Sequence, residues 1–421
     1  MTLYYNTLVV IAGASLLGAL AGLVGSFAVL RKRSLTGDAL SHAALPGVCC
    51  AYLLIGQRSL PVFLVGALAS GVLGIITINL LTTRTRLRED AAIGTVLGVF
   101  FGIGIALSKR ISQLPGGGSR AGLDSFLFGK AASMTLGDVA WISVIAIFCL
   151  VAILLLYKEF KLISFDAGFG QTLGWPVRWL DLALMSLLAI TVVIGLPAVG
   201  VVLTAAMVII PGASARFWTD RFGRMIVLAT LFGGAMGFAG TLLSAYNRFL
   251  PAGPTIVLAG AVIFLISLLG GWRRGMIARY LQWRAFETEI RRRRLLEGVW
   301  TLQQQGRGPG PIQPADLQQL QTWQPRRLNN AIITAFHAGE LTPQSRGLRL
   351  STKGEAAAVD ITRTHLIWKE LLQEHPEQAA AITDLTAPLD GQVQTELIDQ
   401  MQQRLERRGV WPMLPGAEEG L

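Results

Sequence analysis

Residues 37–55 read GDALSHAALPGVCCAYLLI, an apolar run that contains one carboxylate, Asp38, and one imidazole, His42. The run is close to the length that a helix needs to cross about 30 Å of hydrocarbon. Because the two side chains are spaced i, i+4, they project from one helix face and can share a divalent cation. An ionisable pair is costly inside a bilayer and is therefore a functional feature by default. The alternative is that Asp38 caps the helix at the water interface and His42 hydrogen-bonds a neighbouring helix.

The rest of the amino-terminal part has the same apolar character. Further runs long enough, or nearly so, to cross a membrane lie at 6–30, 60–82, 90–108, 137–157, 178–197, 199–215, 225–247 and 254–271. The whole chain has 421 residues, is 52% hydrophobic and 15% charged, and contains 47 glycines, which is too apolar for an ordinary soluble domain. We therefore expect an all-α polytopic membrane protein with about nine transmembrane helices.

Basic residues set the expected orientation. Lysine and arginine gather near 31–33, 84–88, 158–178 and 216–224, which are alternate loops between the runs. Loops of this kind face the cytoplasm. Nine crossings then place the amino terminus outside and the carboxyl-terminal tail in the cytoplasm of a multi-pass protein of the cell (inner) membrane.

Pairs of glycines four residues apart indicate close helix contacts. The pairs are Gly18–Gly22, Gly98–Gly102 and Gly233–Gly237. Small residues at this spacing let helix backbones approach where hydrophobicity gives no driving force between helices. We expect all three pairs to lie at helix interfaces.

Several stretches together resemble the permease family of manganese, zinc and iron ABC importers. They are residues 38–47 (DALSHAALPG), 89–94 (EDAAIG), 123–129 (LDSFLFG), 157–166 (YKEFKLISFD) and 199–211, from Val199 to Pro211. The likeness covers about residues 5–271. It implies that the metal-coordinating helix carries Asp38 and His42. It also implies three partners: an ATP-binding cassette ATPase, a metal-binding solute-binding protein and a second permease subunit, identical or not.

The resemblance also implies an ATPase-coupling segment, Glu159–Gly174, on the cytoplasmic side. The candidate coupling residues are Lys158, Glu159, Phe160, Lys161, Ser164, Phe165 and Asp166. Without the resemblance, the two lysines would be interpreted as an ordinary positive-inside loop. No phosphate-binding loop of the Gly-x-x-x-x-Gly-Lys-Ser/Thr type occurs, so we expect a transporter subunit with ATP hydrolysis in a separate chain. The outer loop 108–135 is the expected docking surface for the binding protein.

The ligand types narrow the expected cargo. One carboxylate and one imidazole, without a thiolate, suit manganese, zinc or ferrous iron and disfavour cuprous copper. Pro46 has no backbone N–H, so it leaves the carbonyl of His42 without its helical partner and adds an oxygen near the pair. Two permeases across a pseudo-twofold axis would double the ligands while binding stays weak enough for release. The metal ion is then the transported substrate, and we expect no permanently bound cofactor.

The sequence after residue 271 changes character. Residues 272–294 carry 8 basic and 2 acidic side chains and form a basic juxtamembrane linker. Residues 295–375 resemble the winged helix of metal-dependent repressors of the diphtheria-toxin-repressor type, most clearly at Leu350–Gly354 and Thr364–Trp368. We expect a small cytoplasmic winged-helix (α+β) domain there, with helices at 295–304 and 325–337 and a two-stranded wing at 341–350. A helical extension, 376–421, follows.

The tail departs from those repressors in its metal ligands. Their metal-binding motif lies on a later helix, whereas residues 379–393 here contain no Cys, His or Glu. His365 is a possible vestigial sensor ligand, and the alternative is an exposed histidine without a ligand role. Membrane tethering and a small net charge disfavour nucleic acid as a partner, although Arg326 and Arg327 could contact phosphates.

Two rival functions remain open at this point. An ion-coupled secondary metal transporter would need a second ion site or a proton relay at the membrane midplane, and the sequence shows one clear ionisable pair. A membrane-tethered metal-responsive regulator would not need nine spans.

Overall fold

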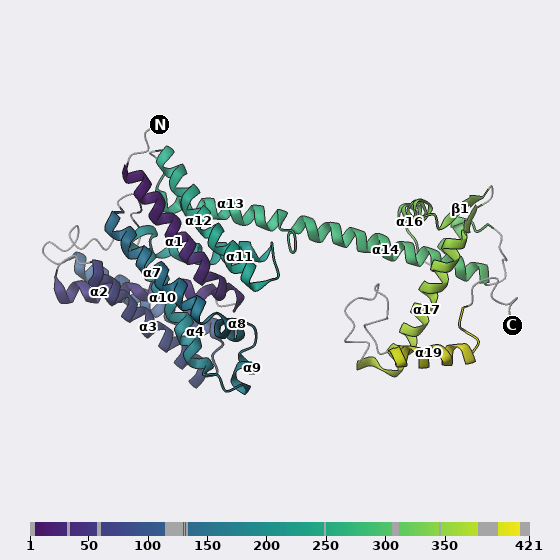
Figure 1. Cartoon of the computed structure of the whole chain (residues 1–421), viewed down its shortest axis with the longest axis horizontal. Coiled ribbons are helices and arrows are strands. Elements are labelled where there is room, and N and C mark those ends of the chain that lie inside the picture. The colour runs from purple at the N-terminus through teal and green to yellow at the C-terminus, as the bar shows by residue number, and fades with distance from the viewer. Residues whose placement is uncertain are drawn as a thin grey trace. The chain divides into compact units, whose positions relative to one another are not determined.

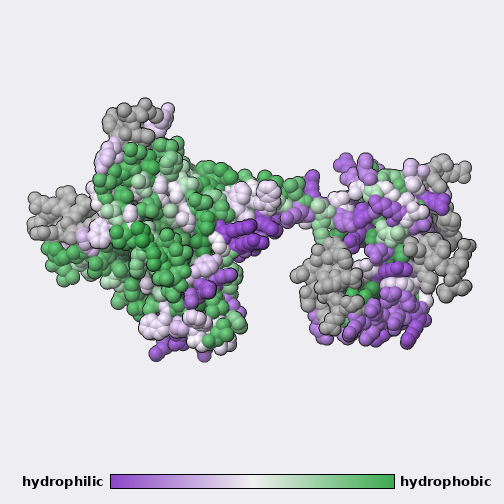
Figure 2. Space-filling view, in the orientation of Figure 1, coloured by the Kyte–Doolittle hydropathy of each residue, from purple (hydrophilic) through white to green (hydrophobic). Residues whose placement is uncertain are grey.

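A computed structural model describes residues 5–31, 34–56, 60–113, 129, 131, 134–247, 250–304, 311–320, 322–344, 347–377 and 395–412. The chain forms two compact units, Met1–Arg279 and Tyr280–Leu421. The first is helical throughout its described part, and the second combines helices with a short hairpin (Figure 1). The visible surface of the first unit is largely hydrophobic, whereas that of the second is largely hydrophilic (Figure 2).

The first unit is built from membrane-length helices. Among the described residues, eight helices are long and apolar enough to cross a membrane. They are α1 (Tyr5–Leu30), α2 (Ser34–Ile55), α3 (Leu60–Arg84), α4 (Glu89–Ser112), α7 (Leu136–Leu155), α10 (Val177–Val199), α12 (Phe222–Tyr246) and α13 (Ala252–Gly270). The ninth expected span is α11 (Val201–Arg216), an apolar helix of only 16 residues. The polytopic helical fold is therefore confirmed, and in place of about nine transmembrane helices the described residues form eight of membrane length and one shorter apolar helix.

A single glycine separates α10 from α11. Gly200 has φ +92°, a conformation that residues with a Cβ rarely adopt. Its N–H donates to the carbonyl of Leu196 at 2.9 Å, and its carbonyl accepts the hydroxyl of Thr204 at 2.6 Å. One residue thus ends one helix and begins the next, which resolves the division of the apolar stretch 178–215.

Two of the three glycine pairs lie at a close helix crossing. Helices α1 and α12 lie side by side, and a Cβ added at Gly18 would overlap the carbonyl oxygen of Gly233 (Figure 1). Gly98 and Gly102 differ, because no described atom outside their own helix lies within 4 Å of a Cβ added there. The expectation that all three pairs form helix interfaces is therefore wrong for the pair on α4, as far as the described residues of this chain are concerned.

The second unit has a small core of its own. Its elements are α14 (Met276–Leu302), α15 (Pro314–Leu320), α16 (Pro325–His337), β1 (Leu341–Gln344), β2 (Gly347–Leu350), α17 (Thr352–Glu374) and α19 (Thr395–Arg407). The strands are antiparallel, with Leu341 opposite Leu350. The end of α14 buries Leu295 and Val299 in the same cluster as Leu328 of α16.

Most of the basic linker is helical and continuous with the residues that follow it. Residues 276–302 form the single helix α14, so the helix expected at 295–304 is the end of a longer one. Ion pairs at i, i+4 spacing, such as Arg291 with Glu287 and Arg293 with Glu289, support this continuation on the helix surface. The sequence interpretation missed it because it treated the arginine run as a linker.

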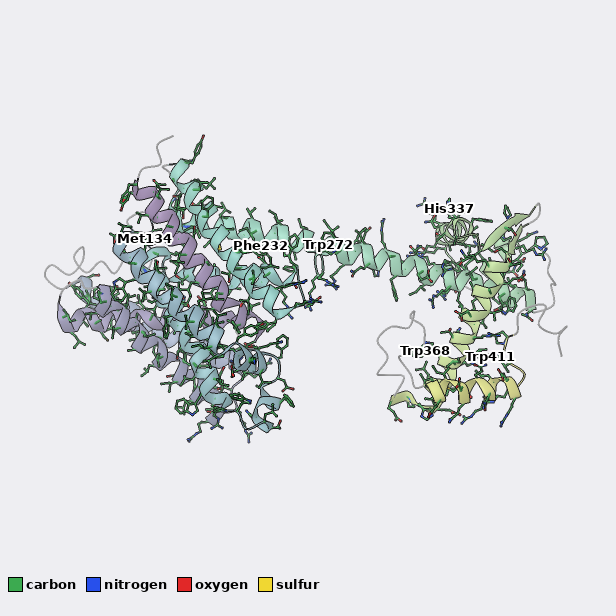
Figure 3. The ribbon with its side chains drawn as sticks, viewed as in Figure 1. Met134, Phe232, Trp272, His337, Trp368 and Trp411 are labelled. Carbon is green, nitrogen blue, oxygen red and sulfur yellow. The ribbon has the colours of Figure 1, made fainter. Side chains whose placement is uncertain are left out.

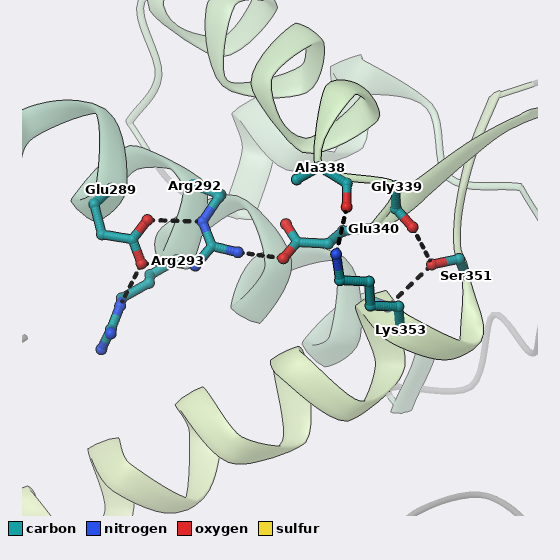
Figure 4. Close-up of polar contacts among 9 residues, drawn as sticks. Glu289, Arg292, Arg293, Ala338, Gly339, Glu340, Ser351 and Lys353 are labelled. Carbon is teal, nitrogen blue, oxygen red and sulfur yellow. Dashed lines mark hydrogen bonds and ion pairs between the residues drawn. The ribbon is translucent and has the colours of Figure 1, made fainter. Parts of the chain in front are cut away.

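A polar cluster ties α14 to the start of the hairpin (Figure 4). Arg292 donates to Glu289 at 2.6 Å and forms an ion pair with the buried Glu340. The hydrogen bonds from Arg292 hold the pKa of Glu289 well below its usual value, at about 2. Ser351 caps α17, because its hydroxyl accepts the N–H of Gly354 at 3.0 Å.

The winged-helix expectation is met only in part. A helix at Pro325–His337 and a two-stranded hairpin within 341–350 are present at the expected places. One two-stranded sheet does not by itself show a winged-helix domain. Residues 379–393, where the repressors carry their later ligands, lie outside the described residues.

Candidate metal and coupling sites

The two candidate metal ligands come together on α2. The Nε2 atom of His42 lies 3.4 Å from Oδ1 of Asp38, as the i, i+4 spacing predicts. The carboxylate side chain is 35% exposed in the single chain and the imidazole 14%, so both side chains are only partly buried. This is the position from which a second chain, or an ion, could reach both side chains.

The ring of His42 is held by packing. It meets the ring of Phe101 on α4 edge-on, with centroids 4.6 Å apart. Its Nδ1 atom is buried and has no hydrogen-bond partner among the described residues. A buried nitrogen without a partner is costly, so it marks a place where a further ligand or proton donor would be stabilising.

The backbone around the pair supplies the oxygen expected from the proline. Helix α2 continues through Pro46, which cannot donate to the carbonyl of His42. The neighbouring carbonyl of Ala43 accepts the hydroxyl of Ser70 at 2.6 Å. Within the described residues no group of three or more His, Cys, Asp or Glu side chains could hold a metal ion. One chain therefore offers two side-chain ligands, too few for a tight site.

The expected coupling segment folds as two short helices, α8 (Tyr157–Phe165) and α9 (Ala167–Thr172). The Oδ1 atom of Asp166 caps α9 by accepting the N–H of Phe169 at 2.8 Å. Lys158 and Lys161 are exposed, as a surface role requires. The hydroxyl of Ser164 donates to the carbonyl of Phe160, so it serves the helix itself.

Phe160 does not lie on the surface of this segment. It is fully buried and packs edge-on against Phe27 of α1, with ring centroids 6.1 Å apart. It cannot touch a partner chain, so its place is that of an anchor between α8 and α1. The Oε2 atom of Glu159 is also buried, without a hydrogen-bond partner among the described residues.

A patch of large apolar side chains does lie on the surface. We define the α8–α9 patch as Phe165, Phe169, Leu173 and Trp175, each between 43% and 60% exposed. Sequence reasoning included the first three in the segment 159–174 but singled out only Phe165. The signal that could have found the others is the run of large apolar residues in a loop with two lysines, where polar residues are usual.

A second polar feature was missed in the sequence. Arg31, after α1, forms an ion pair with Asp181 of α10. Asp181 also lines a cavity of about 40 Å³ together with Thr36, Asn79 and Glu89. A cavity of this size holds a few water molecules at most. Long-range pairing of this kind has no signature in one sequence.

The candidate sensor ligand His365 lies on α17. Its Nδ1 atom is 2.6 Å from Oε1 of Glu297 on α14, and the side chain is 63% exposed. Two groups do not make a metal site. Most of the expected binding-protein surface, 108–135, lies outside the described residues.

A sequence model described as the ABC 3 transport family matches residues 3–271. The chain is 46% identical over 295 residues to the manganese transport system membrane protein MntC of Bacillus subtilis, covering 70% of this chain and 68% of that protein. It is 40% identical over 275 residues to the zinc transport system membrane protein TroC of Treponema pallidum, covering 65% of this chain and 91% of TroC.

Two further similarities point the same way. The chelated iron transport system membrane protein YfeD of Yersinia pestis is 34% identical over 259 residues, which cover 62% of this chain and 83% of YfeD. The solved structure of PsaBC from Streptococcus pneumoniae in complex with Fab matches with a TM-score of 0.58 and 31% identity, covering 67% of this chain and 96% of that chain. The chain belongs to the ABC 3 transport family.

Proposed function

We propose that this chain is the permease subunit of an ATP-driven importer of a divalent transition metal ion, either manganese, zinc or iron. Family membership supports the general function, and the names of its relatives cover all three metals. The protein is then a transporter subunit, and ATP hydrolysis belongs to a separate ATPase chain.

The observation that carries this proposal is the Asp38–His42 pair on a membrane-length helix. The two side chains lie close enough to share an ion. The Nδ1 atom of His42 has no hydrogen-bond partner among the described residues. Imidazole and carboxylate ligands accept manganese, zinc and ferrous iron. The ion is cargo, so its site needs only enough affinity to admit it and little enough to release it.

The incomplete ligand set supports a two-permease assembly. A second copy, or a sister permease, would bring another Asp and His to the ion. The partly exposed carboxylate of Asp38 leaves room for this. A metal-binding solute-binding protein on the outside completes the importer.

The α8–α9 patch supports a docking surface for the ATPase. Its exposed aromatic side chains suit insertion into a groove of a partner chain. Phe160 would pass the movement on, because it joins α8 to α1 inside the bundle. Replacing Phe169 and Trp175 together by alanine should release the ATPase from the purified complex and leave the permease folded. Replacement by alanine of Arg224, which is exposed and lies outside the coupling segment, is the control.

The direct test is uptake by the purified complex in proteoliposomes. Uptake of radioactive manganese, zinc or iron should require ATP on the ATPase side and should not respond to a proton or sodium gradient. Gradient-driven uptake without ATP would favour the rival secondary transporter. Competition among the three metals identifies the cargo.

The expected orientation places the amino terminus outside and the second unit in the cytoplasm. For that unit we propose a winged-helix-like domain with a regulatory interaction role. The order of α16, the β1–β2 hairpin and α17 supports this, and the His365–Glu297 contact supports a remnant of a sensor site. If His365 contributes to regulation, the His365→Ala variant should change the response of uptake to cytoplasmic metal, while the maximal rate stays the same.

A further inference from the structure

The first turns of α14 expose an unusual number of large apolar side chains. We define the α14 apolar face as Met276, Ile277, Tyr280, Leu281 and Trp283, each between 49% and 60% exposed. Trp272, just before the helix, is 81% exposed and is labelled in Figure 3. A soluble helix would place such side chains in a core, and the core cluster that α14 joins begins only at Leu295.

These residues form one face of the helix. Met276, Tyr280 and Trp283 follow the i, i+4, i+7 spacing that aligns side chains along a helix. The opposite side carries Ala278, Gln282 and Ala285, which are small or polar. Most of the exposed apolar side chains in this part of α14 therefore lie on one side of the helix, and Phe286, 46% exposed, extends the apolar surface beyond Arg279.

Two arginines lie on or beside this face. Arg279 lies at one edge of it, and Arg284 lies within it, where its guanidinium sits 4.7 Å from the ring centroid of Tyr280. The segment 272–294 carries 8 basic and 2 acidic side chains. Hydrophobic and hydrophilic atoms lie close together at the start of α14 (Figure 2).

The helix also begins where a membrane span ends. Helix α13 ends at Gly270, and the next turn is fixed because the N–H groups of Arg273 and Arg274 both donate to the carbonyl of Phe217. Arg274 also pairs with Asp220 at 2.7 Å. Met276 therefore starts α14 within one turn of a segment that is anchored at the end of the span.

We infer that the α14 apolar face binds an anionic lipid surface, with its rings among the acyl chains and Arg279 and Arg284 at the headgroup phosphates. A basic amphipathic helix with tryptophan and tyrosine on its apolar side is the chemistry that a membrane interface selects. One arginine at the edge of the apolar face and one within it match phosphate rather than a neutral protein groove. This binding requires α13 to cross the membrane and is independent of the metal carried.

The test uses the full-length protein in lipid nanodiscs with a nitroxide label at one position at a time. Cys50→Ser removes the exposed cysteine, and the buried Cys49 and Cys149 stay in place. Labels at Met276→Cys and Tyr280→Cys report the apolar face, and a label at Gln282→Cys reports the opposite side. In discs containing phosphatidylglycerol, oxygen should relax the first two labels more than a water-soluble nickel complex does. At the Gln282→Cys label, the nickel complex should relax the nitroxide more than oxygen does.

Charge is tested by changing the lipid and the arginines separately. In pure phosphatidylcholine discs the oxygen-to-nickel ratio at Tyr280→Cys should fall. Arg279→Gln with Arg284→Gln should lower it in the anionic discs and leave it unchanged in the neutral ones. Equal nickel access at all three positions, or protection of the apolar face from both reagents by a protein contact, would overturn the inference. A ratio that ignores the arginines would overturn the assignment of anionic lipid.

Discussion

The ring of Phe160 packs edge-on against the ring of Phe27, which joins the short helix α8 to the first membrane-length helix. Phe27 also meets Phe222 edge-on, with ring centroids 5.2 Å apart, so one aromatic cluster touches α1, α8 and α12. The proposed ATPase-docking surface and the helix bundle are therefore mechanically continuous.

Removing the contact between Phe160 and Phe27 should uncouple the ATPase-docking surface from the helix bundle. Phe160→Ala deletes a fully buried ring, and the cavity should destabilise the protein by about 3–5 kcal/mol. Phe160→Leu keeps most of the volume and should cost less than half of that. We expect ATP hydrolysis by the complex to persist in Phe160→Leu while metal uptake per ATP falls. Parallel measurement of phosphate release and isotope uptake checks this, and an unchanged ratio would contradict it.

The candidate ligands can be separated from the helix that carries them. Asp38→Asn and His42→Ala should each reduce uptake at least about tenfold, because each removes half of the ligands that the described chain offers. Size-exclusion chromatography should still show the assembled complex. Cys50→Ser, an exposed position on the same helix, is the control and should transport normally. Undiminished uptake by the double variant would refute the proposed site.

The glycines provide a matched pair of stability tests. Gly18→Ala would push a methyl group into the backbone of Gly233, and overpacking of this kind costs about 1–3 kcal/mol. Gly98→Ala meets no described atom and should leave the thermal midpoint equal or slightly higher, because alanine favours a helix. Thermal unfolding of the two detergent-solubilised variants gives the comparison. An equal loss in both would contradict the crossing described for α1 and α12.

Lowering the pH should destabilise the second unit through protonation of Glu289. Its pKa is about 2 in the folded chain against an ordinary value of 4.5, chiefly because Arg292 donates hydrogen bonds to it. A lowered carboxyl pKa stabilises the fold above about pH 4.5, and this contribution disappears as the pH falls towards 2. The melting transition of the second unit can be identified because it is lost when that unit is deleted. Its midpoint temperature should therefore fall as the pH is lowered over this range. In Glu289→Gln the shift should be smaller, and a shift of the same size would assign it to other carboxyls.

The sequence was sufficient for features that depend on composition and local spacing. The apolar run 37–55 became α2, and the i, i+4 spacing of Asp38 and His42 set their distance. It could not show which neighbours a helix has, so Gly98 looked equivalent to Gly18 although only the latter meets a backbone. The partner of Asp181 was hidden for the same reason, because Arg31 lies far from it in the chain.

Helix ends and continuations were predicted less well than helix centres. A run of arginines suggested a linker, but residues 276–302 form one helix whose last turns enter the core. The hydroxyl of Ser351, which caps α17, also donates to the carbonyl of Gly339, a contact that no local pattern predicts. Such choices are made by tertiary contacts.

The length of α11 has a geometric consequence for the far side of the bundle. A helix of 16 residues rises about 24 Å, less than the hydrocarbon thickness of about 30 Å. If Arg216 lies at one surface of the membrane, the turn at Gly200 between α10 and α11 lies inside the hydrocarbon layer, below the opposite surface. The backbone of Gly129 nevertheless lies against Val199, so part of the connection between α4 and α7 descends to that depth. A metal ion arriving from that side would therefore contact this connecting segment, within the hydrocarbon layer, before it reaches a pathway between the transmembrane helices.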